Sequence, residues 1–341
     1  MIDADVRVHA GSIEKQLAEL WRNEKQAHDD AVTRAALWNV VAHTWNSKQH
    51  AHATEVLASA SASVPQRTIV VRADPNAPHD MQAWISANCH LLGDSRQVCS
   101  EEVSIVAGGE RVDHVAPLVN ALLLPDMPVA VWWLGDLPND HAYVESLLEP
   151  ADRLIVDSSQ FDSAADFALV ARIAEQTTTA PADVNWARVE EWRAASAAVF
   201  DPPAMRARLQ SIAHVRVTTA GGTLGATSEA VLYVSWLMAQ LGYEIPFELA
   251  TQSEEEGISA VDIRFRDNTT ALIRGDRGRG VVKCSAAHAE TELDCITRKR
   301  GRGLSDLIVR LLKQPESDRV YLEALRIARD VAARVAASHA A

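Results

Sequence analysis

Residues 122–136 read LLLPDMPVAVWWLGD and place two adjacent tryptophans in an apolar run. Pro125 and Pro128 bracket a turn, and the run that follows Pro128 has the length and composition of a buried strand. Neighbouring side chains on a strand point to opposite faces. A strand with a tryptophan on each face needs apolar cover on both, as a central strand of an α/β sheet has. We therefore predict that Trp132 and Trp133 are core residues and that the whole stretch is a structural signature.

The flanking sequence alternates between strand and helix patterns. Residues 37–45 and 67–74 are short β-branched runs that predict strands, and the alanine-rich stretch between them predicts a helix. This βαβ pattern implies a parallel strand pair with a right-handed crossover. Residues 82–91 and 97–108 alternate in polarity and predict a hairpin on the same sheet. The other elements expected before residue 200 are strands at 128–136 and 153–159 and helices at 12–27, 110–124, 141–151, 166–176 and 186–200.

The pattern changes after the two prolines at 202–203, which stop a helix. An apolar helix is expected at 227–242, and Gly242 is a suitable residue to end it. Strand patterns then follow one another at short spacing up to residue 300, before two amphipathic helices. We predict an N-terminal α/β domain, residues 1–203, with a mostly parallel sheet covered by helices on both faces. A smaller C-terminal α+β domain, residues 204–341, is expected to contain an antiparallel meander.

Composition limits the classes of function. The formal charge of −13 argues against nucleic-acid binding, which needs a basic surface. No apolar run reaches the roughly 18 residues of a membrane span. The first residues also lack the basic and apolar segments of a secretory leader. We therefore expect a cytoplasmic protein with no membrane or nucleic-acid partner, and with its four cysteines reduced.

A glycine-rich turn lies between a predicted strand and the helix at 227–242. Backbone N–H groups at a helix N-terminus bind anions, and the candidates here are Gly221, Gly222, Thr223 and Gly225. The spacing matches neither the dinucleotide fingerprint nor the P-loop, so no cofactor is predicted. A purely structural turn is the alternative interpretation, and the sequence leaves both open.

Cations cluster between residues 274 and 303, where eight Lys or Arg stand against four acids. A basic patch can bind a phosphorylated ligand or an acidic protein surface. Alternatively, charged residues on a sheet edge deter unwanted strand pairing. The candidate partner-binding residues in this cluster are Arg298, Lys299, Arg300 and Arg302.

The cysteines form no CxxC pair. On the predicted hairpin, Cys89 and Cys99 approach one another across the strands, but their spacing fits no common zinc site and no metal is predicted. Buried structural thiols are the first interpretation. A redox role for Cys99 is the alternative, and it requires an exposed thiol with a lowered pKa. Cys284 and Cys295, which flank a predicted turn, raise the same question.

No catalytic set can be assembled from the sequence. The metalloprotease and nucleophile-elbow motifs are absent, and no Ser/His/Asp combination is evident. Asp136 and Asp157 follow predicted parallel strands, at the edge where open α/β sheets bind ligands. No nucleophile or metal cluster accompanies them, so the sequence predicts no catalytic residue.

Two stretches resemble the glucose-6-phosphate dehydrogenase assembly proteins, the OpcA family. SRQVCSEEVSI at 95–105 is similar to the R-x-V/I-C-x-E segment of that family. HVAPLVNALLLPDMPVAVWWLGD at 114–136 is similar to its L-L-x-P-D-x-P-V-x-x-W-W string. The resemblance covers most of the chain. It departs from the family at Ser100, where many relatives have a second cysteine, so it does not support a dithiol switch built with Cys99.

The resemblance implies a non-catalytic assembly factor or allosteric activator that binds glucose-6-phosphate dehydrogenase. Such a protein would promote the active oligomer of the enzyme in the oxidative pentose phosphate pathway, which yields NADPH. It does not indicate which face contacts the enzyme, so the basic cluster and a strand-end region are both candidates. The strand-end candidates are Arg96, Gln97, Glu101, Glu102, Asp126 and Asp136. The alternative function is a sugar-phosphate- or nucleotide-binding enzyme or sensor that uses the turn from Gly221 to Gly225 and nearby arginines.

Overall fold

The computed structural model describes residues 2–27, 32–92, 96–137, 141–221, 223–253, 257–276, 281–288, 291–298, 303–314 and 316–340. The chain forms two compact units. The first comprises Met1–Val156, Thr178–Pro181 and Gly303–Glu316, and the second comprises Asp157–Thr177, Ala182–Arg302 and Ser317–Ala341. The division into domains 1–203 and 204–341 stays a prediction, since the chain passes between the compact units more than once.

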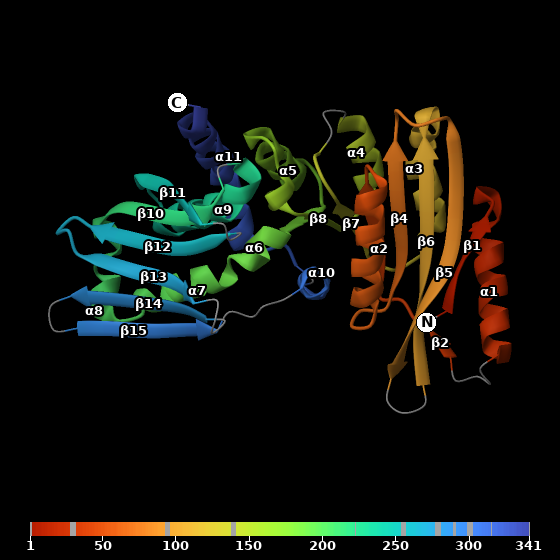
Figure 1. Cartoon of the computed structure of the whole chain (residues 1–341), viewed down its shortest axis with the longest axis horizontal. Coiled ribbons are helices and arrows are strands. Elements are labelled where there is room, and N and C mark those ends of the chain that lie inside the picture. Colours follow the sequence, from red (N-terminus) through yellow and green to blue (C-terminus); the bar gives the residue numbers. More distant parts are fainter. Residues whose placement is uncertain are drawn as a thin grey trace. The chain divides into compact units, whose positions relative to one another are not determined.

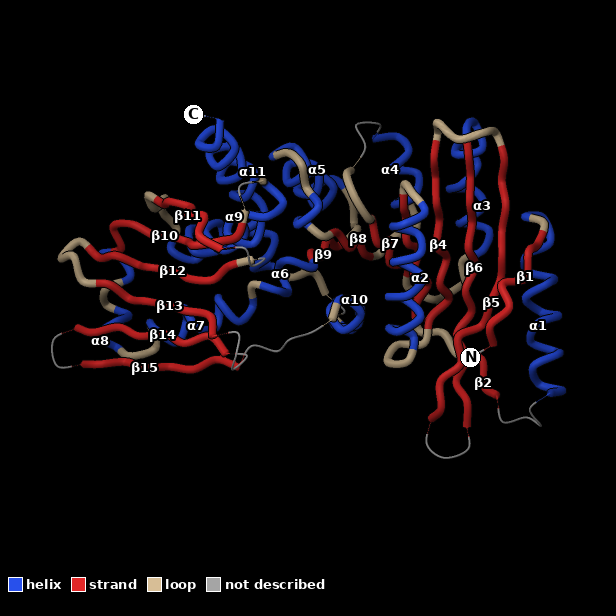
Figure 2. The backbone as a smooth tube through the Cα atoms, viewed as in Figure 1, coloured by secondary structure: helices blue, strands red, loops and turns tan. Residues whose placement is uncertain are grey.

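The first sheet has nine strands in the order β1-β5-β6-β4-β3-β7-β8-β9, with β2 paired to β6 (Figures 1 and 2). Neighbouring strands from β6 to β8 run parallel, whereas β1 and β5 are antiparallel to their neighbours. This confirms the mostly parallel sheet and the expected hairpin. The strands are β1 (Ile2–Val8), β2 (Val32–Arg34), β3 (Trp38–Thr44), β4 (Gln66–Asp74), β5 (Asp80–Leu92), β6 (Arg96–Gly108), β7 (Val129–Trp133), β8 (Arg153–Val156) and β9 (Ala180–Asp183).

Helices cover both faces of this sheet. All five residues of β7 are buried, and Trp132 and Trp133, which point to opposite faces, are each 1% exposed. Helix α2 packs on β3 and β4, α3 packs on β4, α1 packs on β5, and α10 packs on α2. The helices and the 3-10 turns of this unit are η1 (Ala10–Ser12), α1 (Ile13–Ala27), α2 (Ser47–Ser61), η2 (Gly109–His114), α3 (Val115–Leu122), α4 (His141–Leu148) and α10 (Leu304–Lys313).

The strand order has a reversal at its centre. The chain first moves outward from β3 to β4 and β6, then returns to the other side of β3 and continues through β7, β8 and β9. Numbered along the chain, these six strands take the order 3-2-1-4-5-6, which is the doubly wound order of dinucleotide-binding sheets. Ligands of such sheets bind at the carboxyl ends of the strands where the order reverses. Here that switch point lies between β3 and β7.

The second sheet has six strands in the order β11-β10-β12-β13-β14-β15. All its pairs are antiparallel except β10 with β11, which confirms the expected meander. Helices α7 and α9 pack against it, and α11 packs on α5 and α9. The strands are β10 (Ile212–Ala220), β11 (Phe247–Ser253), β12 (Ile258–Phe265), β13 (Thr270–Asp276), β14 (Val281–His288) and β15 (Thr291–Arg298). The helices and 3-10 turns are η3 (Ser158–Gln160), α5 (Ala164–Gln176), α6 (Val184–Arg188), α7 (Glu190–Val199), α8 (Pro203–Arg206), η4 (Leu209–Ser211), α9 (Leu224–Leu241) and α11 (Arg319–Ala340).

Candidate functional site

Aromatic side chains fill the switch point of the first sheet. His43 at the end of β3 stacks on Trp133 at the end of β7, with ring centroids 3.9 Å apart. Trp45 and Tyr143 pack edge-on against the same histidine, at 4.5 and 5.5 Å. The indole nitrogens of Trp45 and Trp133 both donate to the backbone carbonyl of Asp136, at 3.1 and 3.0 Å. The turns that follow β3 and β7 are therefore tied together at this point.

The switch point does not fit a dinucleotide. A dinucleotide-binding turn needs glycines after the first strand, so that its backbone can approach the pyrophosphate. No glycine lies between Thr44 and His50. The side chain of Asn46 instead accepts a hydrogen bond from the backbone N–H of Gln49 at 2.9 Å and caps α2. A Cβ on Gly135 (φ 83°) would lie 2.7 Å from the Gln49 side chain, so the two turns are in close contact.

An ion network joins the amino end of β4 to the middle of β6. The Nε of Arg67 donates to Glu101 at 2.8 Å, and Arg34 pairs with the same carboxylate at 2.7 Å. Trp21 of α1 also donates to Glu101, and Arg67 reaches Glu14 of α1. Arg67 and Glu101 are 1% and 3% exposed. The sequence offered no sign of this buried pair, because each residue alone resembles an ordinary surface charge.

The expected strand-end region is divided between two ends of the sheet, which corrects the prediction of one site. Asp126 precedes β7 and Asp136 follows it, so the length of a strand separates them. Arg96 and Gln97 begin β6, and Gln97 is half-buried. The side chain of Arg96 lies outside the described residues.

Burial limits what two of the acids in this region can contact directly. Glu102 is 4% exposed and accepts a hydrogen bond from Asn88 at 3.0 Å. Glu101 is held in the ion network described above. Asp126 and Asp136, by contrast, are exposed. Partner binding by any of these residues stays a prediction, and burial favours the two exposed aspartates over the two glutamates.

The Pro-Asp-Met-Pro turn is held by one buried side chain. Asn39 of β3 is fully buried and donates to the carbonyls of Leu124 and Met127, at 3.0 and 3.2 Å. Its side-chain oxygen accepts from the Leu124 N–H at 2.8 Å. Asp126 takes a left-handed backbone conformation with φ 63°. The turn therefore has a structural cause that the sequence alone did not reveal.

Cys89 and Cys99 form a disulfide across the hairpin of β5 and β6. They are register partners with Cα atoms 4.0 Å apart, and Cys99 is fully buried. Cys284 is also disulfide-bonded, and it lies opposite Cys295 in the register of β14 and β15. The expectation of reduced thiols is therefore wrong for these hairpins. A redox role for Cys99 stays a prediction.

The glycine-rich turn before α9 has structural reasons for most of its residues. Thr223 caps α9 by accepting a hydrogen bond from the Ala226 N–H at 3.3 Å. Gly221 has φ 67°, which favours glycine. A Cβ on Gly225 would lie 2.3 Å from the Ser159 carbonyl oxygen, so this position needs close backbone approach. Gly222 lies outside the described residues, and anion binding by the turn stays a prediction.

Two aspartates of the second unit, Asp157 and Asp183, lie close enough for their charges to interact, which the sequence did not indicate. Asp157 forms a bidentate pair with Arg188, at 2.8 and 3.0 Å. Asp183 is fully buried, and one of its oxygens accepts from the N–H groups of Ser158 and Asn185, at 3.1 and 2.8 Å. Its other oxygen has no hydrogen-bond partner. Burial, and then the charge of Asp157, raise the pKa of Asp183 to about 7.

The basic cluster falls largely outside the part of the chain that the structure describes. Lys299, Arg300 and Arg302 are not described, and Arg298 ends β15 with its side chain undescribed. Two other cations of the cluster are paired within the sheet. Arg274 pairs with Asp262, and Lys283 pairs with Asp276 at 2.9 Å. A role of the cluster in binding stays a prediction.

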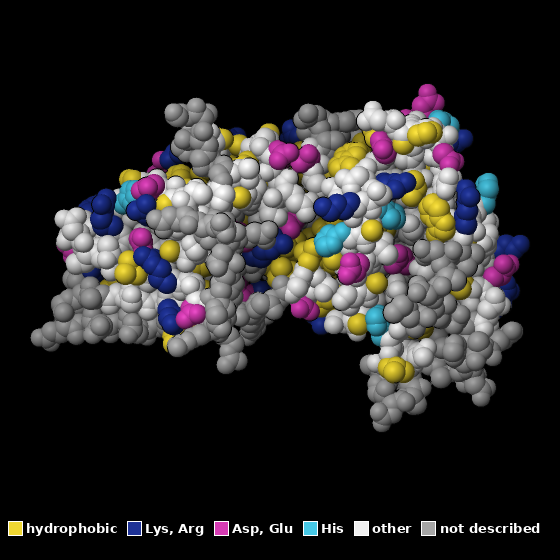
Figure 3. Space-filling view, viewed as in Figure 1, with side chains coloured by type: hydrophobic (Ala, Val, Ile, Leu, Met, Phe, Trp, Pro, Cys, Tyr) yellow, Lys and Arg dark blue, Asp and Glu magenta, His cyan; other side chains and the backbone are white. Residues whose placement is uncertain are grey.

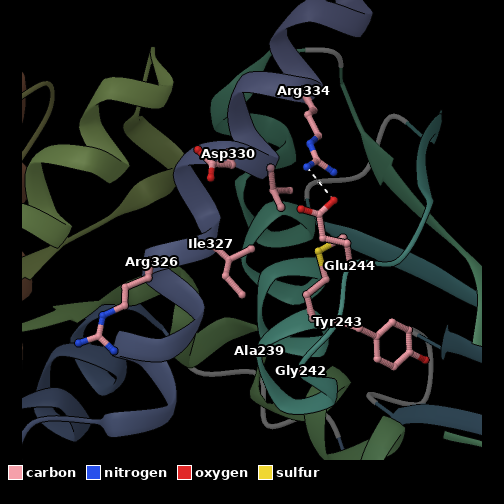
Figure 4. Close-up of a pocket in the computed structure, with 10 residues that line it drawn as sticks. Ala239, Gly242, Tyr243, Glu244, Arg326, Ile327, Asp330 and Arg334 are labelled. Atoms are coloured by element: carbon pink, nitrogen blue, oxygen red, sulfur yellow. Dashed lines mark hydrogen bonds and ion pairs between the residues drawn. The ribbon is translucent and has the colours of Figure 1, made fainter. Parts of the chain in front are cut away.

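A cavity of about 380 Å³ lies between α9 and α11 (Figure 4). Ile327 points into it from α11, and the charged groups lie around its rim. Those charges are matched inside the chain, since Arg334 pairs with Glu244 at 3.0 Å and Arg326 pairs with Glu175 at 3.5 Å. The cavity therefore offers no unmatched charge to a ligand.

The described residues contain neither a metal-binding cluster nor a membrane-spanning helix. No group of three or more His, Cys, Asp or Glu in them could hold a metal ion. No described helix is long and apolar enough to cross a membrane.

The strand order and the filled switch point define a doubly wound α/β chain that lacks the glycine turn of dinucleotide-binding proteins. The chain belongs to the OpcA family of glucose-6-phosphate dehydrogenase subunits. Residues 57–172 match the family model described as the glucose-6-phosphate dehydrogenase subunit N-terminal domain. Residues 179–325 match the model described as its C-terminal domain.

Curated relatives named OpcA support the same assignment. The relative from Synechocystis sp. is 27% identical over 183 residues, covering 53% of this chain and 38% of the relative. The relative from Nostoc punctiforme is 23% identical over 205 residues, covering 60% of this chain and 43% of the relative. The chain thus matches about two-fifths of the length of these relatives.

Solved structures resemble the chain at the level of the fold. A super-repressor mutant of Gal80p from Saccharomyces cerevisiae has a TM-score of 0.50 and 10% identity, covering 90% of this chain and 96% of that chain. Levoglucosan dehydrogenase in complex with NADH has a TM-score of 0.48 and 11% identity, covering 90% and 98%. At such identities the likeness concerns the fold alone.

Proposed function

We propose that this chain is a non-catalytic assembly factor for glucose-6-phosphate dehydrogenase. The observation that carries the proposal is the family match, which extends over residues 57–172 and 179–325 and so over most of both compact units. The relatives that carry the name OpcA are described by that name as proteins of the OxPP cycle. We therefore place the chain beside the dehydrogenase of the oxidative pentose phosphate pathway, in the cytoplasm, where the enzyme yields NADPH.

Two features support a role without catalysis. The sequence contains no recognisable nucleophile or metal motif. The position where a dinucleotide-type sheet would carry out its chemistry is occupied by His43, Trp45 and Trp133. A fold used for cofactor binding elsewhere is then available as a scaffold, since function belongs to sites and not to folds.

The assembly factor would act by preferential binding. A protein that binds the active conformation or oligomer of an enzyme more tightly than the inactive one shifts the equilibrium toward activity. The shift cannot exceed the difference between the two binding free energies. Coupling of this kind is typically about 1–3 kcal/mol, which corresponds to roughly 5–150-fold in affinity.

The test is to mix the purified chain with its cognate glucose-6-phosphate dehydrogenase. We expect kcat to rise or KM to fall by at least about fivefold, at the lower end of ordinary coupling, and the dehydrogenase to sediment faster. Lysozyme at equal concentration is the control for general protein effects. If kcat, KM and sedimentation are all unchanged, the proposal is wrong.

Charge reversal distinguishes the two candidate surfaces. Arg298→Glu with Arg300→Glu should weaken binding and flatten its salt dependence if the basic cluster contacts the enzyme. The matched control reverses Arg326 and Arg329 on α11, which are 61% and 60% exposed. Unchanged affinity in the first variant would exclude the basic cluster as the surface that contacts the enzyme. The exposed Asp136 would then be the residue to reverse next.

A further inference from the structure

A groove lies at the carboxyl ends of β4 and β6, beside the filled switch point. It consists of two hollows, of about 440 and about 470 Å³, which share Asp80 and Gln82. The first hollow lies over the ends of β4 and β6 and the start of α2, and the second extends to β1 and η2. Each has the size of a small-ligand pocket. The carboxyl ends of parallel strands are also where open α/β sheets bind ligands. We term this feature the crest groove.

Three arginines line the crest groove without a direct ion pair. They are Arg7 on β1, Arg72 on β4 and Arg111 on η2. Within the described residues, none of them forms an ion pair. Several other described arginines do form ion pairs, as Arg188 does with Asp157 at 2.8 Å. The groove thus gathers three guanidinium groups in a chain whose formal charge is −13.

The second hollow concentrates these positive groups. His9 and His79 line it together with Arg7 and Arg111. The pKa of Asp80 is lowered, first by the hydrogen bonds it accepts from Gln82 and Met81 and also by the charges of Arg7 and Arg111, so both guanidinium groups lie near this carboxylate. Figure 3 shows Lys or Arg, His and also Asp or Glu side chains near the upper ends of β5 and β6.

The first hollow has a different chemistry. Asp74, Asp80 and Gln82 line it, together with Asn46 and Ser47 at the start of α2. Carboxylate and amide oxygens accept hydrogen bonds from hydroxyl groups. The two aspartates would repel an extended acidic surface, whereas they would suit the hydroxyls of a sugar. The second hollow therefore holds Arg7 and Arg111 beside the shared Asp80, and the first hollow holds Arg72 beside hydrogen-bond acceptors.

We propose that the crest groove binds a sugar phosphate, with the phosphate between Arg7 and Arg111 and the sugar hydroxyls toward Asp74 and Gln82. The planar guanidinium group matches phosphate oxygens in bidentate hydrogen bonds, which makes arginine the usual residue for this recognition. Arg72 adds a third positive charge within the first hollow. The inference does not depend on the proposed function.

Calorimetric titration of the full chain at low salt tests the proposal. The probes are ribose 5-phosphate, glucose 6-phosphate and inorganic phosphate, with ribose and glucose as uncharged counterparts. We expect at least one sugar phosphate to bind saturably and more tightly than inorganic phosphate. Arg7→Gln with Arg111→Gln should weaken that binding at least about tenfold, because each lost charge-assisted hydrogen bond contributes of the order of 1.5–3 kcal/mol and a tenfold change is 1.4 kcal/mol.

Two variants make the experiment specific. Arg264→Gln removes an equal kind of charge from an exposed position on β12 and should leave binding unchanged. Asp74→Asn should weaken sugar-phosphate binding more than phosphate binding, because only the sugar reaches it. Thermal unfolding of each variant checks that the fold is intact.

Three results would overturn the proposal: no saturable binding of any phosphate probe at concentrations up to about 10 mM, equal loss in the Arg264→Gln control, or sugars that bind as tightly as their phosphates. The proposal would also be wrong if the parent chain binds no phosphate and the Arg7→Gln, Arg111→Gln variant no longer affects the dehydrogenase. The two arginines would then contact the partner enzyme. That last result would leave the proposed function standing.

Discussion

At the scale of single residues, Trp132 and Trp133 anchor both faces of the first sheet. Both are 1% exposed on a strand whose five residues are all buried. Large-to-small changes at such positions remove buried contacts and leave a cavity. We expect Trp132→Ala or Trp133→Ala to lower the free energy of unfolding by about 3–5 kcal/mol in urea titrations. The exposed Leu37, at 59%, is the control position for truncation to alanine. A loss near zero, with partner binding abolished, would instead identify the tryptophans as interface anchors.

Asp183 should make the stability of the second unit depend on pH. Its folded pKa of about 7 lies above the unfolded value of 3.8. The folded chain therefore binds the proton more tightly, and stability falls as pH rises from about 4 to about 7. The side chain of Asp183→Asn stays neutral at every pH. We therefore expect the melting temperature of this variant to increase relative to that of the parent chain as the pH rises over this window. Asp306→Asn, at an exposed position, is the control. Parallel pH profiles for parent and Asp183→Asn would contradict the assignment.

His43 should act in the opposite direction. Burial lowers its pKa from 6.5 to about 3, and neither ring nitrogen has a hydrogen-bond partner. The unfolded chain therefore binds the proton more tightly, and stability is lost as pH falls from about 6.5 toward about 3. His43→Phe keeps an aromatic ring beside Trp133. It should reduce the acid-dependent loss in the free energy of unfolding by a few kcal/mol. His52→Gln, on the exposed side of α2, should not change it. If the stability of both variants depends on pH as steeply as that of the parent chain, His43 does not cause the acid sensitivity.

At the scale of elements, Asn39 positions the turn that leads into β7. Its amide makes three hydrogen bonds to backbone groups of Leu124 and Met127. Asn39→Ala would leave buried backbone groups without partners, which costs about 1–3 kcal/mol. We expect that loss in the free energy of unfolding, measured by urea titration. Asn120→Ala, an exposed asparagine on the neighbouring helix α3, should cost little. An equal loss in both variants would show that the three hydrogen bonds are not the cause.

Strong periodic patterns were predictable at this scale, and weak ones were not. The parallel pair of β3 and β4, the hairpin of β5 and β6 and the end of α9 at Gly242 (φ 73°) follow from local sequence signals. Strands β1, β2, β9 and β11 were missed; β2 and β9 have only three and four residues, and β9 contains a proline. Helix α10 was expected to close the second domain. Its apolar stripe packs on α2 in the first unit, which only long-range contacts determine.

The candidate site was less predictable than the elements, because it depends on distances across the sequence. Asp126 and Asp136 are ten positions apart in the chain but lie at opposite ends of one strand. Glu101 carried no local sign of its contact with Arg67, 34 residues away. The arginines of the crest groove come from three different elements, and no motif links them.

At the scale of the whole molecule, strand order and local chemistry point in different directions. The order around β3 is that of a dinucleotide-binding sheet, and a reader of topology alone would expect a cofactor at its centre. The side chains at that centre indicate that no cofactor binds there, because Trp45 and Gln49 occupy the space that the glycines of a dinucleotide turn leave free.

We therefore expect the chain not to bind NADH or NADPH at the switch point. The measurement is thermal unfolding with each dinucleotide, made in the Arg7→Gln, Arg111→Gln variant so that the crest groove does not contribute. A ligand at about 100 times its Kd would stabilise the fold by about 2.7 kcal/mol, which is easily seen. An NADH-dependent dehydrogenase in the same buffer is the positive control. A saturable rise in melting temperature that Trp45→Ala alters would show that the aromatic cluster opens to admit a dinucleotide. The chain would then have to be treated as a cofactor-binding protein despite its closed switch point.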